Sequence, residues 1–326
     1  MSKHLDKWCE HLPDDLVAAF ADSAPPVLFL GAGFGAEAVP PLKTGTDLAE
    51  LLRAELHVTD HTVPLAELLQ YYKNCHSRSD RSVRAWMEKH LNWGTSIPTE
   101  PGGAHHLLLR LPFRILLTTN YDDLLDRAAL RTLPAGTWRS TTSIDDFKLS
   151  LSTPGSSKKT CAHVHGAFSA SVTSPLVAST DDYIAHYLNK SSWLNEIEEL
   201  IPQYRFLFIG YGMRDFTVWS SYFTAIMKHS TAMWPHGMVC PPQSQHDLLF
   251  WLHYNISFIP LLGYQFLIAL SARLGLLTDE ETAVCAAAAC WKITPELARP
   301  QFSDVHRSLG YATPELTLRH IINETH

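Results

Sequence analysis

The sequence lacks the marks of a nucleic-acid-binding protein. Lys and Arg total 26 against 33 Asp and Glu, which gives a formal net charge of −7. The nearest approach to a basic cluster is "SSKKT" at 156–160, which has the composition of a loop. Proteins that bind DNA or RNA directly present a basic patch or stripe. The composition therefore disfavours direct nucleic-acid binding.

The sequence also lacks a zinc-ribbon pattern, a signal peptide and a membrane span. Its six cysteines, at positions 9, 75, 161, 240, 285 and 290, form no C-x-x-C pair, so we expect free thiols and no metal site. The first residues, "MSKHLDKWCEHL", are too polar for a signal peptide. The longest apolar stretch, 256–270, is too short for a span and is broken by Pro260 and Gln265. These features predict a cytoplasmic protein with no part in a membrane.

What the sequence does contain is a series of short apolar runs that alternate with helical patterns. Its 326 residues are 46% hydrophobic and 18% charged, as in a globular protein. Strands are expected at 24–30, 114–118, 161–168, 175–180, 204–209, 237–242 and 256–261. Continuous apolar runs predict a parallel sheet with helices on both faces, a Rossmann-like α/β fold. The Ser- and Thr-rich passage 137–160 is expected to be loop.

The ends of several expected strands carry glycines or uncharged polar residues. They are Gly31-Ala32-Gly33, Thr118-Thr119-Asn120, His163-Val164-His165-Gly166 and Gly210-Tyr211-Gly212. In open parallel sheets, ligands bind beyond the carboxyl ends of the strands. Residues of this kind at that edge predict a phosphorylated or nucleotide ligand.

The segment "GAGFGA" matches the pattern G-x-G-x-x-A with Gly31, Gly33 and Ala36. Glycines in such a turn let the backbone approach a pyrophosphate at a helix N-terminus. A dinucleotide-binding unit of the dehydrogenase type needs a second strand and an acid about 20 residues further on. Here a helical segment follows instead, so a hydride-transferring dehydrogenase is disfavoured. A tight turn without a ligand would have the same sequence.

Asn120 and a histidine are the candidate chemical groups. A phosphate ligand would repel a carboxylate at the position of Asn120, whereas a carboxamide can donate and accept hydrogen bonds there; a turn or cap role is the alternative. Asp122 fits a helix start, where an acid complements the helix dipole. His165 can titrate near neutrality and act as a general base. Position alone does not separate His165 from His163.

Two helical regions are expected outside the sheet. One is an insertion at about 46–110, and the other is a C-terminal appendage at 266–326, which leaves 1–265 as the main domain. Within the appendage, Thr278 precedes a helical pattern with Glu281 three residues later, which predicts a capping box. Two "TPEL" segments place a threonine cap before a proline at the first helical position.

Taken in order, several motifs resemble those of the sirtuin-like superfamily. They read "GAGFG" (31–35), "TTNYD" (118–122), "VHG" (164–166), "STDDY" (179–183) and "GYGMRD" (210–215). The Asn-Tyr-Asp variant and "GYGMRD" are similar to the prokaryotic sirtuin-like NAD hydrolases of antiphage defence. The resemblance covers roughly 25–262 and implies that 1–265 is an NAD-binding catalytic domain.

The resemblance implies an activity and a set of site residues. NAD⁺ would be the substrate and would be cleaved to nicotinamide and ADP-ribose. Asn120 would position the attacking water or the nicotinamide ribose, and His165 would be the base. The implied ligand contacts are Gly31, Ala32, Gly33, Phe34, Thr119, Asp122, Gly210, Tyr211 and Gly212. The sequence departs from the family's pattern at two points. Gly35 stands where the family usually has serine, and the zinc-binding cysteines of deacylase sirtuins are absent.

Two alternatives to an antiphage, abortive-infection NAD⁺ hydrolase stay open: an NAD-dependent protein deacylase, and a non-catalytic sensor of NAD or ADP-ribose that controls assembly. The missing cysteines argue against the deacylase. The family also implies a homo-oligomer and a separately encoded ATPase or nuclease partner. The helical segments 60–110 and 266–326 are the candidate contact surfaces.

Overall fold

The computed structural model describes most of the chain. The described residues are 3–22, 25–35, 41–76, 79–91, 103–152, 158–170, 174–188, 192–211, 235–241, 251–252, 255–291, 295–309 and 312–325. Gly212, Ala36 and Asp215 lie outside them. No helix of the described part is both long and apolar enough to cross a membrane.

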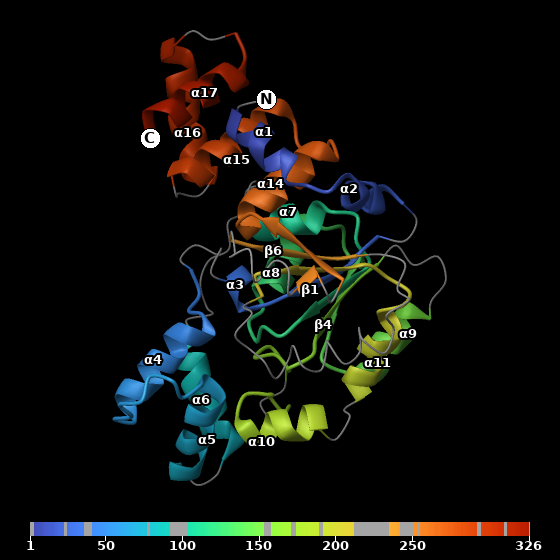
Figure 1. Ribbon diagram of the computed structural model, residues 1–326, viewed down its shortest axis with the longest axis vertical. Helices are drawn as coiled ribbons and strands as arrows, with labels where there is room; N and C mark the ends of the chain where they lie inside the picture. Colours follow the sequence, from blue (N-terminus) through green and yellow to red (C-terminus); the bar gives the residue numbers. More distant parts are fainter. Residues whose placement is uncertain are drawn as a thin grey trace.

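A seven-stranded parallel sheet forms the centre of the molecule, in the order β3-β4-β2-β1-β5-β6-β7. The strands are β1 (Val27–Leu30), β2 (Ile115–Thr118), β3 (Trp138–Thr141), β4 (Lys159–His163), β5 (Phe206–Ile209), β6 (His236–Cys240) and β7 (Ile256–Pro260). Residues of β1, β2 and β5 are buried throughout, as central strands of a covered sheet must be. The expected Rossmann-like α/β fold is confirmed (Figure 1).

Alternate residues of each strand face two different cores. Leu28 and Leu30 belong to the core on one face, and Val27 and Phe29 to the core on the other. Helices α1 (Lys3–Glu10), α2 (Asp14–Ala21), α7 (Ala104–Arg110), α8 (Leu124–Thr132) and α14 (Gly263–Arg273) cover the first face. Helices α9 (Ile144–Leu151) and α11 (Ser192–Leu200) cover the second face.

Three helices of the expected insertion, which lie between β1 and β2 in the sequence, form a separate apolar cluster. They are α4 (Gly45–Glu55), α5 (Leu65–Cys75) and α6 (Asp80–Leu91). Helix α4 begins at a capping box, in which Thr44 accepts from the amide of Asp47 while the Asp47 carboxylate accepts from the amide of Thr44. The cluster also contains Phe168 and Ala178, from the chain that follows β4. Helix α7, inside the expected insertion range, packs in the main core.

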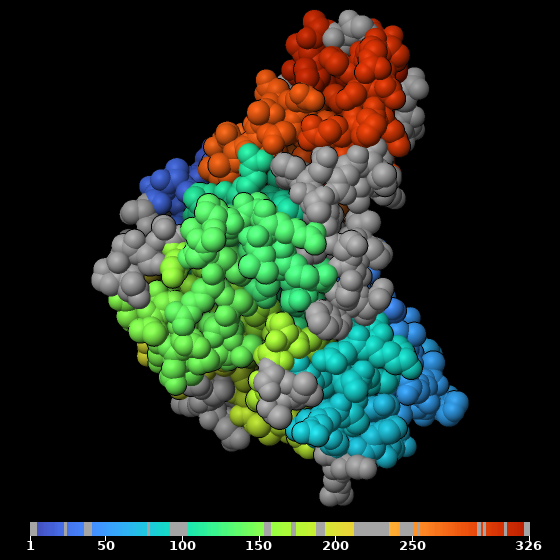
Figure 2. All heavy atoms as spheres, turned by 180° about the vertical axis from the view of Figure 1, so that it is seen from behind, coloured from blue at the N-terminus to red at the C-terminus, as the bar shows by residue number. Residues whose placement is uncertain are grey.

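The C-terminal region consists of α15 (Asp279–Trp291), α16 (Pro295–Leu309) and α17 (Pro314–Thr325). The helix starts predicted at Thr278, Pro295 and Pro314 are confirmed, and Thr278 and Glu281 exchange both hydrogen bonds of a capping box. The expected domain boundary at 265–266 falls inside α14, whose residues 266–270 are fully buried. Helices α15–α17 and helices α4–α6 lie at opposite ends of the molecule (Figures 1 and 2).

Two local expectations are wrong. The passage 137–160 was expected to be loop but contains β3 and α9. Strand β3 reads Trp-Arg-Ser-Thr and lies at the edge of the sheet, where half-exposed polar residues are tolerated. Residues 175–180 were expected to be a strand but contain none. Instead, the amide of Val177 donates to the carbonyl of His165, which holds this segment beside the end of β4.

Candidate active site

The turns after β1 and β5 pack directly against each other. The amide of Gly33 donates to the carbonyl of Gly210 over 2.8 Å. A Cβ on Gly31 or Gly33 would lie 2.7 Å from that same oxygen, and Gly210 has a φ of +66°. The three glycines are therefore needed for contact between the two turns. In the structure, these glycines allow the backbones of the two turns to approach each other closely. Their predicted contact with a pyrophosphate stays a prediction.

The side chains next to these glycines differ in their surroundings. Phe34, in the short helix α3 (Ala32–Gly35), is buried with its ring 4.9 Å from that of His105. The ring of Tyr211 packs at 5.3 Å against Phe29 in the sheet core. Ala32 is exposed. A ligand at this edge would meet Phe34 and Tyr211 through their backbone and Ala32 through its surface.

Asn120 has a fixed backbone and an unpartnered side-chain oxygen. Its amide donates to Thr118 Oγ1 over 3.0 Å, and its carbonyl accepts from His163 Nδ1 over 3.0 Å. The amide of Thr119 donates to the carbonyl of Leu30, which ties the end of β2 to β1. Among the described residues, the Oδ1 atom of Asn120 is buried and has no hydrogen-bond partner. Leaving such an atom unsatisfied costs about 1–3 kcal/mol, so it is a natural place for a ligand hydroxyl.

Asp122 lies at the start of α8. Its carboxylate accepts from the amide of Leu124 over 3.1 Å, which is an Asx-turn just before α8, whose N-cap is Asp123. Burial raises the pKa of this carboxyl above its ordinary value. The structure thus gives Asp122 a role in starting α8. Its predicted ligand contact stays a prediction.

His163 is held between two acceptors. Its Nε2 lies 3.3 Å from Asp126 Oδ2, and its Nδ1 lies 3.0 Å from the carbonyl oxygen of Asn120. A carboxylate and a carbonyl can only accept, so both ring nitrogens must carry protons. Although burial opposes the charge, the neighbouring Cys161 and Asp126 raise the pKa of His163 well above its ordinary value. His163 is therefore a buried imidazolium paired with Asp126.

His165 lies in an aromatic environment. Its ring is 5.4 Å from that of Tyr183 and 5.6 Å from that of His186, both edge-on. These two residues belong to α10 (Thr180–Tyr183) and the π-helix η1 (Ile184–Leu188). Burial, and then the nearby His186, hold the pKa of His165 well below its ordinary value.

The two histidines are thus in opposite protonation states. His163 already carries its second proton and cannot accept another, whereas His165 is neutral and can. Val164 donates its amide to the carbonyl of Thr118, which brings the ends of β2 and β4 together. The ring of Tyr121, next to Asn120, lies 6.5 Å from the ring of His165. Of the two histidines left open by the sequence, His165 is the one whose pKa is lowered, and its role as a base stays a prediction.

An arginine of the insertion holds the loop that follows His165. The Arg84 guanidinium is 4% exposed and donates to the carbonyl oxygens of Ala167, Phe168, Ala170 and Ser174. Gly166, at the start of this loop, has a φ of +84°, and a Cβ there would lie 2.5 Å from the carbonyl oxygen of Pro175. No sequence motif marked Arg84, because apart from Glu88, which its Nε contacts at 2.9 Å, these partners are backbone atoms far along the chain.

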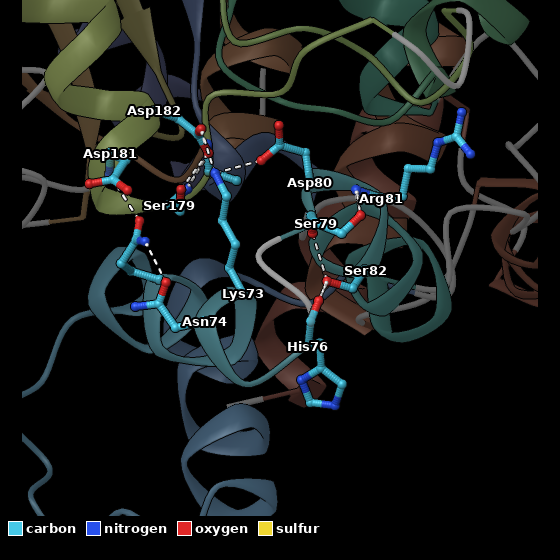
Figure 3. Close-up of polar contacts among 12 residues, drawn as sticks. Lys73, Asn74, His76, Ser79, Asp80, Arg81, Ser82, Ser179, Asp181 and Asp182 are labelled. Carbon is cyan, nitrogen blue, oxygen red and sulfur yellow. Dashed lines mark hydrogen bonds and ion pairs between the residues drawn. The ribbon is translucent and has the colours of Figure 1, made fainter.

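A second contact joins the insertion to the wall around His165. Lys73 of α5 lies 3.4 Å from Asp182 and 2.5 Å from Asp80 (Figure 3). Asp182 also accepts from the amide and hydroxyl of Ser179, which forms the capping box that starts α10. Helix α10 carries Tyr183, which touches His165. The insertion therefore supports the segment that encloses the candidate base.

The described residues contain no group of three or more His, Cys, Asp or Glu side chains arranged to hold a metal ion. The groups that follow the neighbouring strands β2 and β4 include a carboxamide, a neutral imidazole and backbone groups. Such groups recognise hydroxyls and polar heterocycles. Together with the parallel sheet, they define a Rossmann-like α/β protein with a polar site at the carboxyl edge.

Comparison with known proteins agrees with this description. Residues 114–259, which run from β2 to β7, match the family described as "SIR2-like domain". The chain is 26% identical over 193 residues to "NAD(+) hydrolase ThsA" of Acinetobacter baumannii (strain 532279). The match covers 58% of this chain and 36% of that protein. Residues 114–259 of the chain are thus similar to a SIR2-like domain.

Proposed function

We propose that this chain is an NAD⁺ hydrolase, which cleaves NAD⁺ with water to nicotinamide, ADP-ribose and a proton. The observation that carries the proposal is the buried Oδ1 of Asn120, which has no partner among the described residues. Asn120 follows β2, and the neighbouring strand β4 leads to His165, which is buried and neutral. The family and the name of the relative support the same substrate.

The chemistry of NAD⁺ suits these two groups. Nicotinamide leaves as a neutral molecule from a cationic precursor, so no strong acid is needed at the leaving group. The ribose passes through an oxocarbenium-like state, which needs orientation, exclusion of water and a base for the attacking water. A carboxamide and one neutral imidazole supply those functions.

In this scheme each side chain has one role. Asn120 Oδ1 accepts a hydrogen bond from a ribose hydroxyl or from the attacking water, because it is the acceptor left free by the protein. His165 accepts the proton that this water or hydroxyl loses. The negative pyrophosphate of bound NAD⁺ raises the proton affinity of His165, which burial otherwise keeps low.

The biological role extends the proposal by analogy with the family. Depletion of NAD⁺ by this chain would act as an abortive-infection response to phage, in a homo-oligomer or with an ATPase or nuclease partner. Expression of the wild type and of Asn120→Ala in a phage-sensitive host tests the role. Equal plaque counts in the two strains would contradict it.

The activity itself is tested by nicotinamide release from NAD⁺, with and without an acylated peptide. The proposal predicts release that does not depend on peptide and is abolished in Asn120→Ala and His165→Ala. His61→Ala is a matched control, because this histidine is exposed. Release only with peptide would indicate a deacylase. Tight NAD⁺ binding with a change in oligomer size and no turnover would indicate a sensor.

A further inference from the structure

His163 is a buried charged group that the proposed reaction does not use. It stands at the carboxyl end of β4, in register with Thr118 of β2, and is 3% exposed. Its pairing with Asp126 places an ion pair directly behind the strand end that carries Asn120. Asp126 is held in turn by Trp138, whose indole Nε1 donates to Asp126 Oδ1 over 2.8 Å. A buried ion pair is costly unless its geometry is fixed.

The contact of His163 with Asn120 is made on the backbone. Thr118 Oγ1 accepts from the amide of Asn120, and His163 Nδ1 donates to its carbonyl, so both polar backbone groups of Asn120 are held. Thr118 Oγ1 also donates to the carbonyl of Leu30, so this hydroxyl has both of its roles filled. Within the described part of the chain, the side-chain Oδ1 of Asn120 is buried and has no partner. The surroundings therefore fix the residue and leave its amide oxygen for a ligand.

We infer that His163, oriented by Asp126, is a positioning residue that holds the Asn120 carboxamide at the reacting centre. The inference rests on the proposed NAD⁺ hydrolysis for its kinetic readout. His163 acts through Asn120 and touches no substrate atom. Its Nε2–H faces Asp126, with Cys161 Sγ at 3.8 Å, and its Nδ1–H is the donor to Asn120.

Two substitutions test the contacts of the two imidazole nitrogens of His163 separately. His163→Asn places an amide N–H where Nδ1 stands, which keeps the donor to Asn120 and loses the pair with Asp126. His163→Gln places an amide N–H where Nε2 stands, which keeps a donor to Asp126 and loses the donor to Asn120. Both variants remove the buried charge, so a purely structural role predicts similar effects on turnover.

The inference predicts that kcat falls at least about tenfold in His163→Gln, while His163→Asn stays within about threefold of the wild type. KM changes little in either variant, because His163 lies behind Asn120. His236→Asn is the control, since His236 is another buried strand histidine whose Nδ1 accepts from the amide of Phe206. It should change the melting temperature and leave kcat unchanged. Equal loss of kcat in the Asn and Gln variants would overturn the inference.

A measurement without turnover keeps the two proposals apart. ¹⁵N NMR of the wild-type imidazole should show both ring nitrogens of His163 protonated, with a through-hydrogen-bond coupling from Nδ1 to the Asn120 carbonyl carbon. If the wild type fails to cleave NAD⁺, the proposed function is wrong and the NMR result still decides the contact. A neutral His163, or a protonated one without that coupling, would refute the positioning role even in an active enzyme.

Discussion

Replacing Gly210 with alanine tests whether the turns after β1 and β5 depend on glycine for their contact. A Cβ at this position would lie 2.2 Å from the amide nitrogen of Phe34 and 2.8 Å from the carbonyl carbon of Gly33. Both are backbone atoms and cannot rotate away. The left-handed φ of +66° costs about 1–2 kcal/mol for alanine, and the overlap adds roughly 1–3 kcal/mol or more.

Gly136 provides the matched control. It has a φ of +79°, but nothing lies within 4 Å of an added Cβ, so Gly136→Ala carries only the backbone cost. In thermal unfolding monitored by circular dichroism, we expect the Gly136→Ala midpoint to fall by about 2–4 °C. The Gly210→Ala midpoint should fall at least about twice as far, with loss of NAD⁺ cleavage. Equal shifts in the two variants would show that the turns do not need the close contact.

Three further predictions follow from the contacts of other residues. Arg84→Met lowers the free energy of unfolding by about 3 kcal/mol or more in urea titration, and Arg84→Lys does not restore it, because lysine lacks the planar array of donors. Acidification from pH 6.5 to about pH 5 destabilises the fold by roughly 2 kcal/mol for each of His105 and His236. Burial lowers the pKa of His105 to about 3 and that of His236 to about 4, so in this pH range the unfolded chain binds protons that the folded chain does not. His236→Phe should remove the contribution of His236 to the pH dependence of the unfolding free energy. Lys73→Met lowers the free energy of unfolding by less than about 1 kcal/mol, because Asp80 is 73% exposed, yet hydrogen exchange of α10 should rise. Unchanged exchange would show that the ion pairs of Lys73 with Asp80 and Asp182 do not stabilise α10.

Much of the fold was predictable because local signals and burial agree. The central strands are continuous apolar runs, and the capping residues at Thr278 and the prolines at 295 and 314 mark helix starts that the structure has. Strand β3 was not predictable, because its residues are mostly polar and it becomes an edge strand only by pairing with β4 in the folded sheet. Helix α9 begins at a Ser143 cap, a signal hidden within a Ser- and Thr-rich passage.

The placement of site residues was predictable where it follows from the parallel direction of the strands. Carboxyl ends of parallel strands share one edge, so the placement of Asn120 and His165 on neighbouring strand ends follows from the order of the motifs. The different protonation states of His163 and His165 were not predictable. They depend on burial, on Asp126 beside His163 and on His186 beside His165, which come together only in the folded chain.

The central claim is that the carboxamide of Asn120 and the imidazole of His165 act on the same glycosidic bond. A double-mutant cycle on the rate of nicotinamide release tests it most directly, with Asn120→Ala, His165→Ala and the double variant measured at saturating NAD⁺. If both groups serve one step, the double variant is scarcely slower than the slower single variant. Losses that multiply, or single variants that release nicotinamide as fast as the wild type, would contradict the claim.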